Sequence, residues 1–148
     1  MLPLALRLSN KRVLLIGAGP VAWRRAQTLL TEGALLDVVA PVAIPEIQDA
    51  AVAGRLNWHA RKYSPADLSG AWLVFAHTDS AELNRKIAVE CERQNIWCLT
   101  GGDHTGSDIW MMARAHPQKD LTVAVTAHGN PRRAKDILRR ILATFANE

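Results

Sequence analysis

The sequence predicts an α/β fold, a Rossmann-type doubly wound parallel sheet with a C-terminal dimerisation extension. Three observations predict it. Apolar runs of strand length alternate with amphipathic segments of helix length between residues 12 and 100. A glycine-rich turn joins the first apolar run to the first helical segment. Residues 109–148 break the alternation, which indicates an element added after the sheet.

Five short runs are predicted to be strands, over 12–16, 35–40, 56–60, 72–76 and 96–100. The runs over 12–16 and 72–76 are apolar, which is typical of parallel strands that are buried on both faces. Apolar residues recur at helical spacing between these runs. This spacing predicts helices over 20–32, 44–53 and 80–95, and a short helical turn after Ser64-Pro65. Pro20 suits the first turn of a helix, and Gly33 suits its end.

The C-terminal part is predicted to contain a helix over 109–115, a strand over 121–126 and a basic helix over 131–145. A domain of this length offers little to cover Trp110, Met111, Met112 and the apolar strand. We therefore divide the chain into a domain over 1–108 and an extension over 109–148. We expect the extension to pair with a second subunit in a homodimer.

The formal charge of +4 and the isoelectric point near 9.5 favour anionic partners. The excess of basic over acidic residues is too small to indicate a nucleic-acid partner, and too few aromatic residues lie among the basic ones. No apolar run approaches the length of a membrane span. Cys91 and Cys98 lack metal-binding spacing, and without a secretory leader they indicate reduced thiols. The sequence thus predicts a soluble, cytoplasmic protein without nucleic-acid or membrane partners.

The segment from Gly17 to Ala22 has the pattern G-x-G-x-x-A between a predicted strand and a predicted helix. The first glycine permits a tight turn, and Gly19 lets the backbone approach a pyrophosphate. Ala22 keeps the helix close to the strand, and the helix N-terminus directs N–H groups at the phosphates. The pattern therefore predicts a Rossmann domain that binds a dinucleotide.

Recognition of the ribose cannot follow the usual pattern of this fold. Many such domains place an acidic residue at the end of the second strand, where this sequence has Ala40-Pro41. Asp37 lies in the middle of the strand, so recognition of the ribose must come from the backbone near Pro41 and Val42, or from elsewhere in the protein. The choice between NAD and NADP stays open. The absence of an Arg or Lys directly after the strand favours NAD.

The order of several short motifs resembles that of a known family over essentially the whole chain. The matching residues are Leu2-Pro3-Leu4, Leu8, Lys11, the strand and turn from Val13 to Gly19, Ala22, Arg24-Arg25, Val38 to Pro41, Thr78-Asp79, Asn84, Cys98, Asp103, Leu121 to Thr126, Gly129, Pro131, Ala134 and Ile137. Together they resemble the precorrin-2 dehydrogenase/sirohydrochlorin ferrochelatase family, which includes the N-terminal modules of siroheme synthases.

The resemblance implies a function in siroheme biosynthesis. It implies NAD-dependent dehydrogenation of precorrin-2, a tetrapyrrole, to sirohydrochlorin, and dimerisation through the segment after the fifth strand. It implies that Asp103 is the functional aspartate. The cofactor-binding set is then Gly17, Ala18, Gly19, Pro20, Val21, Ala22, Pro41, Val42, Thr78 and Asp79.

The sequence also departs from the family pattern. The stretch from Leu99 to Asp103 is one residue longer than usual, Ala113 replaces a proline, and His128 lies in an altered turn. The chain ends at Glu148, where the family continues into a further helical domain that we expect to be absent. Whether the protein also inserts ferrous iron or cobalt into the tetrapyrrole therefore stays open. A non-catalytic NAD-binding or metal-handling module, or a dehydrogenase for another anionic metabolite, are the alternatives.

Three groups of side chains suggest chemistry beyond cofactor binding. Asp103 follows a strand end and could accept the proton that dehydrogenation releases, or could only cap a turn. Arg132 and Arg133, with His128, could bind substrate carboxylates, or the basic helix could simply be solvated. His104 could ligate a metal at the same rim as His77, although the histidine spacing matches no compact metal motif.

Overall fold

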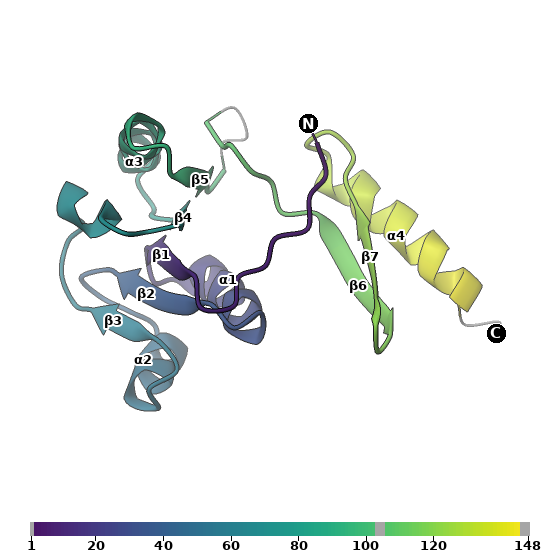
Figure 1. The fold of residues 1–148 in the computed structure, drawn as a ribbon, viewed down its shortest axis with the longest axis horizontal. Helices are drawn as coiled ribbons and strands as arrows, with labels where there is room; N and C mark the ends of the chain where they lie inside the picture. Colours follow the sequence, from purple (N-terminus) through teal and green to yellow (C-terminus); the bar gives the residue numbers. More distant parts are fainter. Residues whose placement is uncertain (1, 103–105, 146–148) are drawn as a thin grey trace. The chain divides into compact units, whose positions relative to one another are not determined.

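A computed structural model describes residues 2–102 and 106–145. The chain divides into two compact units, Leu6–Ile109 and Trp110–Glu148, and Met1–Ala5 groups with the second unit. The first unit holds a five-stranded sheet, and the second holds a two-stranded sheet (Figure 1).

All five strands of the first unit run parallel, in the order β3-β2-β1-β4-β5. They are β1 (Arg12–Ile16), β2 (Leu35–Val39), β3 (Asn57–His59), β4 (Leu73–Ala76) and β5 (Trp97–Thr100). Each end lies within one residue of the predicted strand, so the predicted doubly wound sheet is confirmed. The chain adds β2 and β3 on one side of β1 and then returns to the other side for β4, which reverses the strand order between β1 and β4.

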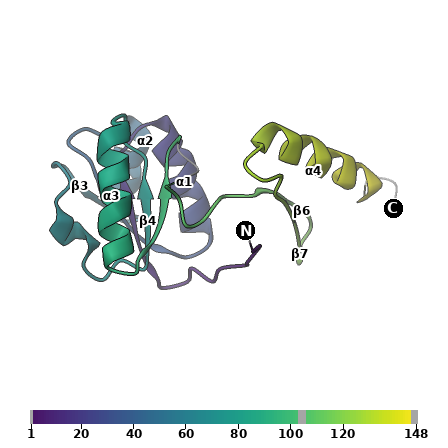
Figure 2. The ribbon, with the colours of Figure 1, turned by 90° about the horizontal axis from the view of Figure 1, so that it is seen from above.

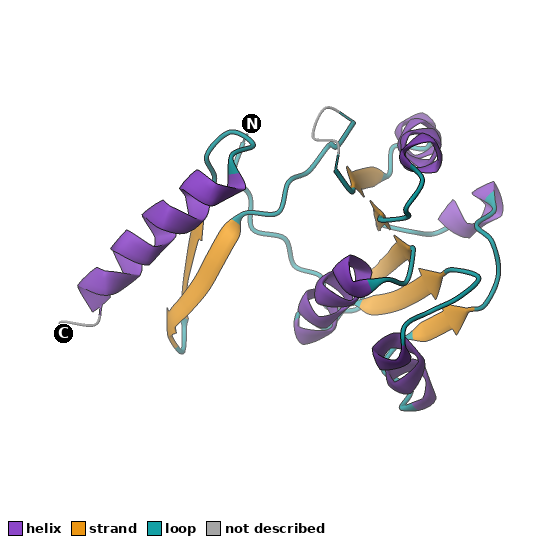
Figure 3. Ribbon diagram, turned by 180° about the vertical axis from the view of Figure 1, so that it is seen from behind, coloured by secondary structure: helices purple, strands orange, loops and turns teal. Residues whose placement is uncertain are grey.

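The helices of the first unit are α1 (Pro20–Thr31), α2 (Pro45–Val52), the 3₁₀ helix η1 (Pro65–Leu68) and α3 (Ala81–Arg93), as predicted. Right-handed crossovers place α1 and α2 on one face of the sheet and α3 on the other; Figures 2 and 3 show α1 and α3 on opposite sides. Helix α1 buries Ala22, Ala26 and Leu29 at helical spacing. The helix ends just before Gly33, whose φ of 76° favours glycine.

The face covered by α3 carries an apolar core. It joins Leu14, Ile16, Val74, Ala76 and other strand residues to Ile87 and Cys91 of α3 and to Cys98 of β5. The contact with Cys91, together with burial, raises the pKa of the Cys98 thiol. Both cysteines are free and buried. They therefore serve as small apolar core residues.

The Asp37 carboxylate accepts hydrogen bonds from two side chains of neighbouring strands. Arg12 Nε donates to Asp37 Oδ2 at 2.7 Å, and Asn57 Nδ2 donates to Oδ1 at 3.0 Å. Burial alone would raise the pKa of Asp37, but the hydrogen bonds from Asn57 and Arg12 outweigh it and hold the pKa below its usual value. Asp37 thus ties β1, β2 and β3 together and is not available to a ribose.

We expect Asp37→Asn to reduce the free energy of unfolding by about 1–3 kcal/mol at neutral pH, because Arg12 loses a charged partner. Since the folded pKa of Asp37 is lowered, its stabilising effect is present above the unfolded pKa of about 3.9 and disappears as the pH falls through the folded value. Urea unfolding at neutral and acid pH, beside the exposed control Asp49→Asn, measures both effects. A variant as stable as the wild type at neutral pH would contradict this role.

The second unit consists of the antiparallel hairpin β6 (Ala113–Gln118) and β7 (Leu121–Val125) and the helix α4 (Pro131–Phe145). Helix α4 packs against both strands and buries Ala134 and Leu138. Asn130 Oδ1 accepts a hydrogen bond from the Arg133 amide at 3.0 Å, and so caps the helix next to Pro131. The predicted strand 121–126 and the predicted basic helix are confirmed.

The predicted helix over 109–115 is wrong. Residues 109–112 have no regular secondary structure, and 113–118 form β6. The apolar run from Ile109 to Ala115 is short, and such a run does not distinguish a strand from a helix. Residues 113–118 form a strand because β7 pairs with them across the turn at Lys119-Asp120. Pro117, which has no N–H to donate, lies where the pairing is irregular.

Candidate functional site

The predicted glycine turn lies at the point where the strand order of the first unit reverses. It connects the carboxyl end of β1 to the start of α1, beside the carboxyl end of β4. In open α/β sheets, ligands bind at such a switch point because neighbouring connections leave in opposite directions. The turn therefore occupies the expected position for a dinucleotide.

Gly17 is required by the backbone of this turn. Its φ is 105°, in the region that disfavours residues with a Cβ. A Cβ on Gly17 would lie 2.3 Å from the carbonyl oxygen of His77, which follows β4. The absence of a side chain thus allows the ends of β1 and β4 to approach each other, while the Gly17 amide donates to Val39 O at 3.0 Å.

Gly19 is placed for a different reason. It is the N-cap of α1, with extended backbone angles, and a Cβ on it would find no atom within 4 Å. A cradle of backbone with open space above it, at a helix N-terminus, fits the pyrophosphate of a dinucleotide. Ala22 is buried at 1% exposure, as the close packing of α1 on the sheet requires.

Two apolar side chains are exposed beside the turn. Val21 is 45% exposed in the first turn of α1, and Val42 is 79% exposed after β2. The Ile44 amide donates to Ala18 O at 3.1 Å, which holds the segment after β2 against the glycine turn. Pro41, also exposed, lies directly past the end of β2. Exposed apolar groups at this edge can pack against the rings of a dinucleotide.

The loop after β4 is held in place by Asn84, a buried residue of α3. Asn84 Oδ1 accepts hydrogen bonds from the Thr78 amide at 3.1 Å and from Thr78 Oγ1 at 2.7 Å, and Nδ2 donates to Thr78 O at 3.1 Å. The loop therefore presents Thr78 in a fixed orientation and leaves Asp79 exposed. Asn84 is one of the residues that match the family pattern, but its positioning role was not predicted from the sequence.

Asp103 and His104 lie outside the described residues. The chain on either side is bonded to the sheet: the Gly101 amide donates to Ala76 O at 2.8 Å, and the Thr100 amide donates to Ser107 Oγ at 2.9 Å. Among the side chains that the structure describes, no group of three His, Cys, Asp or Glu residues could hold a metal ion.

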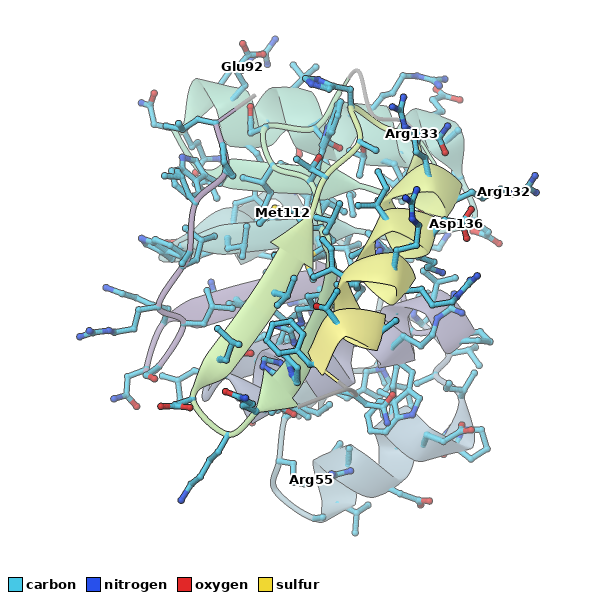
Figure 4. All side chains as sticks on the ribbon, turned by 90° about the vertical axis from the view of Figure 1, so that its right-hand side faces the viewer. Arg55, Glu92, Met112, Arg132, Arg133 and Asp136 are labelled. Carbon is cyan, nitrogen blue, oxygen red and sulfur yellow. The ribbon has the colours of Figure 1, made fainter. Side chains whose placement is uncertain are left out.

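The predicted substrate residues lie in the second unit, around the start of α4. Arg132 and Arg133 project from its first turn, near Asp136 (Figure 4). His128 lies in the preceding turn with a φ of 45°, and all three predicted residues are exposed. The structure thus brings His128, Arg132 and Arg133 to one end of one helix.

None of the described helices is long and apolar enough to cross a membrane.

Comparison with known proteins places these features in a family. The profile of a family described as "Putative NAD(P)-binding" matches residues 4–113. The chain is 32% identical over 146 residues to the precorrin-2 dehydrogenase of Bacillus subtilis (strain 168), covering 95% of this chain and 86% of that protein. It is 38% identical over 128 residues to siroheme synthase 1 of Aeromonas salmonicida (strain A449), covering 86% of this chain.

The chain spans only 27% of the length of that siroheme synthase. A solved structure described as "SirC, precorrin-2 dehydrogenase" matches with a TM-score of 0.86 and 25% identity, over 97% of this chain and 71% of that one. These similarities confirm the resemblance predicted from the sequence. The chain belongs to the putative NAD(P)-binding family that includes precorrin-2 dehydrogenase and the siroheme synthases.

Proposed function

We propose that the protein uses NAD to dehydrogenate precorrin-2 to sirohydrochlorin in siroheme biosynthesis. The observation that carries the proposal is the open backbone cradle at Gly19, at the switch point of a chain related over 95% of its length to a precorrin-2 dehydrogenase. The reaction removes a hydride and a proton from the tetrapyrrole. When bound, the dinucleotide supplies the hydride acceptor.

We assign the dinucleotide to the carboxyl edge of the sheet. The turn from Gly17 to Ala22 holds the pyrophosphate over the start of α1. Pro41 and Val42 contact the adenosine side, since they follow β2. Thr78 and Asp79, which follow β4, contact the other half of the cofactor. The rigid support that Asn84 gives to Thr78 favours this assignment.

The proton acceptor in this proposal is the Asp103 carboxylate. Asp103 comes two residues after Gly101, whose amide is bonded to the end of β4. The described chain reaches the carboxyl edge of the sheet at Gly101, and a carboxylate next to the reacting carbon accepts the proton that dehydrogenation releases. The proposal covers dehydrogenation and does not extend to metal insertion.

The substrate carries many carboxylates, and the exposed residues Arg132, Arg133 and His128 match that charge. Arg139 pairs with Asp136 at 3.3 Å and is therefore partly neutralised. The two arginines of the first turn of α4 are accordingly our candidates for substrate binding. The buried, free Cys91 and Cys98 fit a reducing compartment, which supports a cytoplasmic location.

We further expect a homodimer built by the second unit. Two strands and one helix form a small core, and a two-stranded sheet gains stability by packing against further structure. Leu121, Val123 and Val125 of β7 are only partly buried within the described residues. Light scattering at micromolar concentration should give twice the chain mass of 16.3 kDa. A monomer mass would contradict this prediction.

The function is tested by converting precorrin-2 under anaerobic conditions with the purified chain. We expect the absorption spectrum of sirohydrochlorin to develop only when NAD is present. Conversion at the same rate without NAD would refute the cofactor assignment. Binding of NAD without any conversion would favour the non-catalytic module.

A further inference from the structure

Two side chains donate hydrogen bonds to the backbone of the segment that follows β2. Trp58 Nε1, from the centre of β3, donates to Ala40 O at 3.0 Å. Gln48 Nε2, from α2, donates to Ala43 O at 2.7 Å. The two residues between these bonds, 41–42, are the ones that we assign to the adenosine half of NAD. Neither donor was assigned a site role from the sequence.

The Trp58 hydrogen bond fixes the peptide that joins Ala40 to Pro41. This peptide has no N–H, because proline has none, so its carbonyl oxygen is its only hydrogen-bonding group. The peptide is planar and the proline ring fixes its own φ, so a bond to the carbonyl also orients the ring. The Ala40 amide donates to His59 O at 3.3 Å. Strand β3 therefore holds Ala40 by both its N–H and its carbonyl group.

The other end of the segment is held by α2 and by the glycine turn. The Gln48 side chain reaches back past Ile44, the N-cap of α2, to the carbonyl of Ala43. The Ile44 amide donates to Ala18 O at 3.1 Å. Val42, between the anchored ends, is exposed. A segment that is fixed at both ends and exposed between them can contact a ligand with little further loss of conformational freedom.

The Trp58 indole makes two contributions that can be separated. Its half-buried ring belongs to β3, which pairs with β2 and packs against α2. Its N–H bonds beyond the sheet, to the connection at the carboxyl edge. A phenylalanine keeps an aromatic ring for packing and removes the N–H. The hydrogen bond can therefore be removed without emptying the space that the ring fills.

We propose that Trp58 and Gln48 are positioning residues of the dinucleotide site, which hold Pro41 and Val42 in the geometry that contacts the adenosine half of NAD. Contacts that are held in place before binding raise affinity because they lower the entropic cost of association. The proposal rests on the proposed function for the identity and place of the cofactor. It adds that two side chains acting through the backbone set the affinity for NAD.

Calorimetric titration of the full chain with NAD tests the proposal in Trp58→Phe. We expect the Kd for NAD to rise by about threefold to tenfold, the range for one neutral hydrogen bond. The KM for NAD should rise by a similar factor while kcat stays within about twofold, because the hydride is accepted by the other half of the cofactor. Gln48→Met, which keeps the length of the side chain and lacks the donor, should also raise the Kd.

The matched control is Trp97→Phe, which makes the same chemical change elsewhere. Trp97 is the first residue of β5, so it lies at the amino edge of the parallel sheet, opposite the edge assigned to the cofactor. Its replacement should leave the Kd for NAD within about twofold of the wild type. A rise in Kd as large as that in Trp58→Phe would overturn the proposal, because it would be a general effect of losing an indole.

A thermal melt separates the positioning role from a purely structural one. If the Trp58 N–H only stabilises the fold, Trp58→Phe lowers Tm and leaves both the Kd and the KM for NAD unchanged, which would overturn the proposal. Gln48 is an exposed residue of α2, so Gln48→Met provides a second test should Trp58→Phe fail to fold. An unchanged Kd for NAD in Gln48→Met would also refute the positioning of this segment.

The wild-type result distinguishes this proposal from the proposed function. If the wild type binds NAD and both variants bind it equally well, the positioning roles are wrong and the proposed function stands. If the variants weaken NAD binding as expected but the wild type converts no precorrin-2, the positioning roles stand and the proposed reaction is wrong. A folded wild type that binds no NAD would refute both.

Discussion

Gly19→Val should weaken NAD binding by more than about 100-fold, equivalent to about 2.8 kcal/mol, and leave the protein folded. Gly19 has extended backbone angles, which valine adopts without strain and which suit the residue before a proline. Its Cβ would meet no atom of the protein, so the new side chain would project into the space assigned to the pyrophosphate. Calorimetry and a thermal melt measure the two effects. Unchanged NAD affinity in the folded variant would refute the assignment.

Gly17→Ala provides the contrast. A methyl group there would lie 2.3 Å from the carbonyl oxygen of His77, and the φ of 105° is strained for alanine. We expect a loss of stability of several kcal/mol, on the order of 1–3 kcal/mol from the backbone strain alone. Loss of NAD binding with retained stability in Gly19→Val, and loss of stability in Gly17→Ala, together separate a binding role from a structural one.

Asp103→Asn should slow dehydrogenation by roughly 10² to 10⁴, the range expected for removing a positioned general base. The asparagine keeps the shape of the side chain and removes its basicity. NAD affinity should barely change, because we assign the pyrophosphate to the Gly17 to Ala22 turn, which lies on another connection. Single-turnover NADH formation under anaerobic conditions measures the rate.

A cap role for Asp103 predicts a different pattern. The same substitution would then reduce the free energy of unfolding by about 1 kcal/mol and leave turnover nearly unchanged. A thermal melt beside the kinetics distinguishes the two roles. Wild-type turnover in Asp103→Asn would exclude the general-base assignment.

The first unit could be predicted because its signals are local. Strands β1, β2, β4 and β5 are short, mainly apolar runs between turn residues, and α1 and α3 have clear helical spacing. The glycine turn could be placed at the switch point because a βαβ unit fixes the position of its first connection. The order of the motifs was enough to indicate the family, which the relatives confirm.

The rest depends on contacts that sequence periodicity does not show. Strand β6 exists because β7 pairs with it, and the apolar run before it carries no sign of that partner. Asn84 acts through three hydrogen bonds to Thr78, six residues away.

The central claim is that this chain transfers a hydride from precorrin-2 to NAD. Its most direct test is the stoichiometry of NADH formed per precorrin-2 consumed, measured by NADH fluorescence under anaerobic conditions with excess enzyme. We expect equimolar NADH and sirohydrochlorin with the wild type, and neither product with Gly19→Val. Absence of NADH from a folded wild-type protein that binds NAD, or sirohydrochlorin without NADH, would contradict the account.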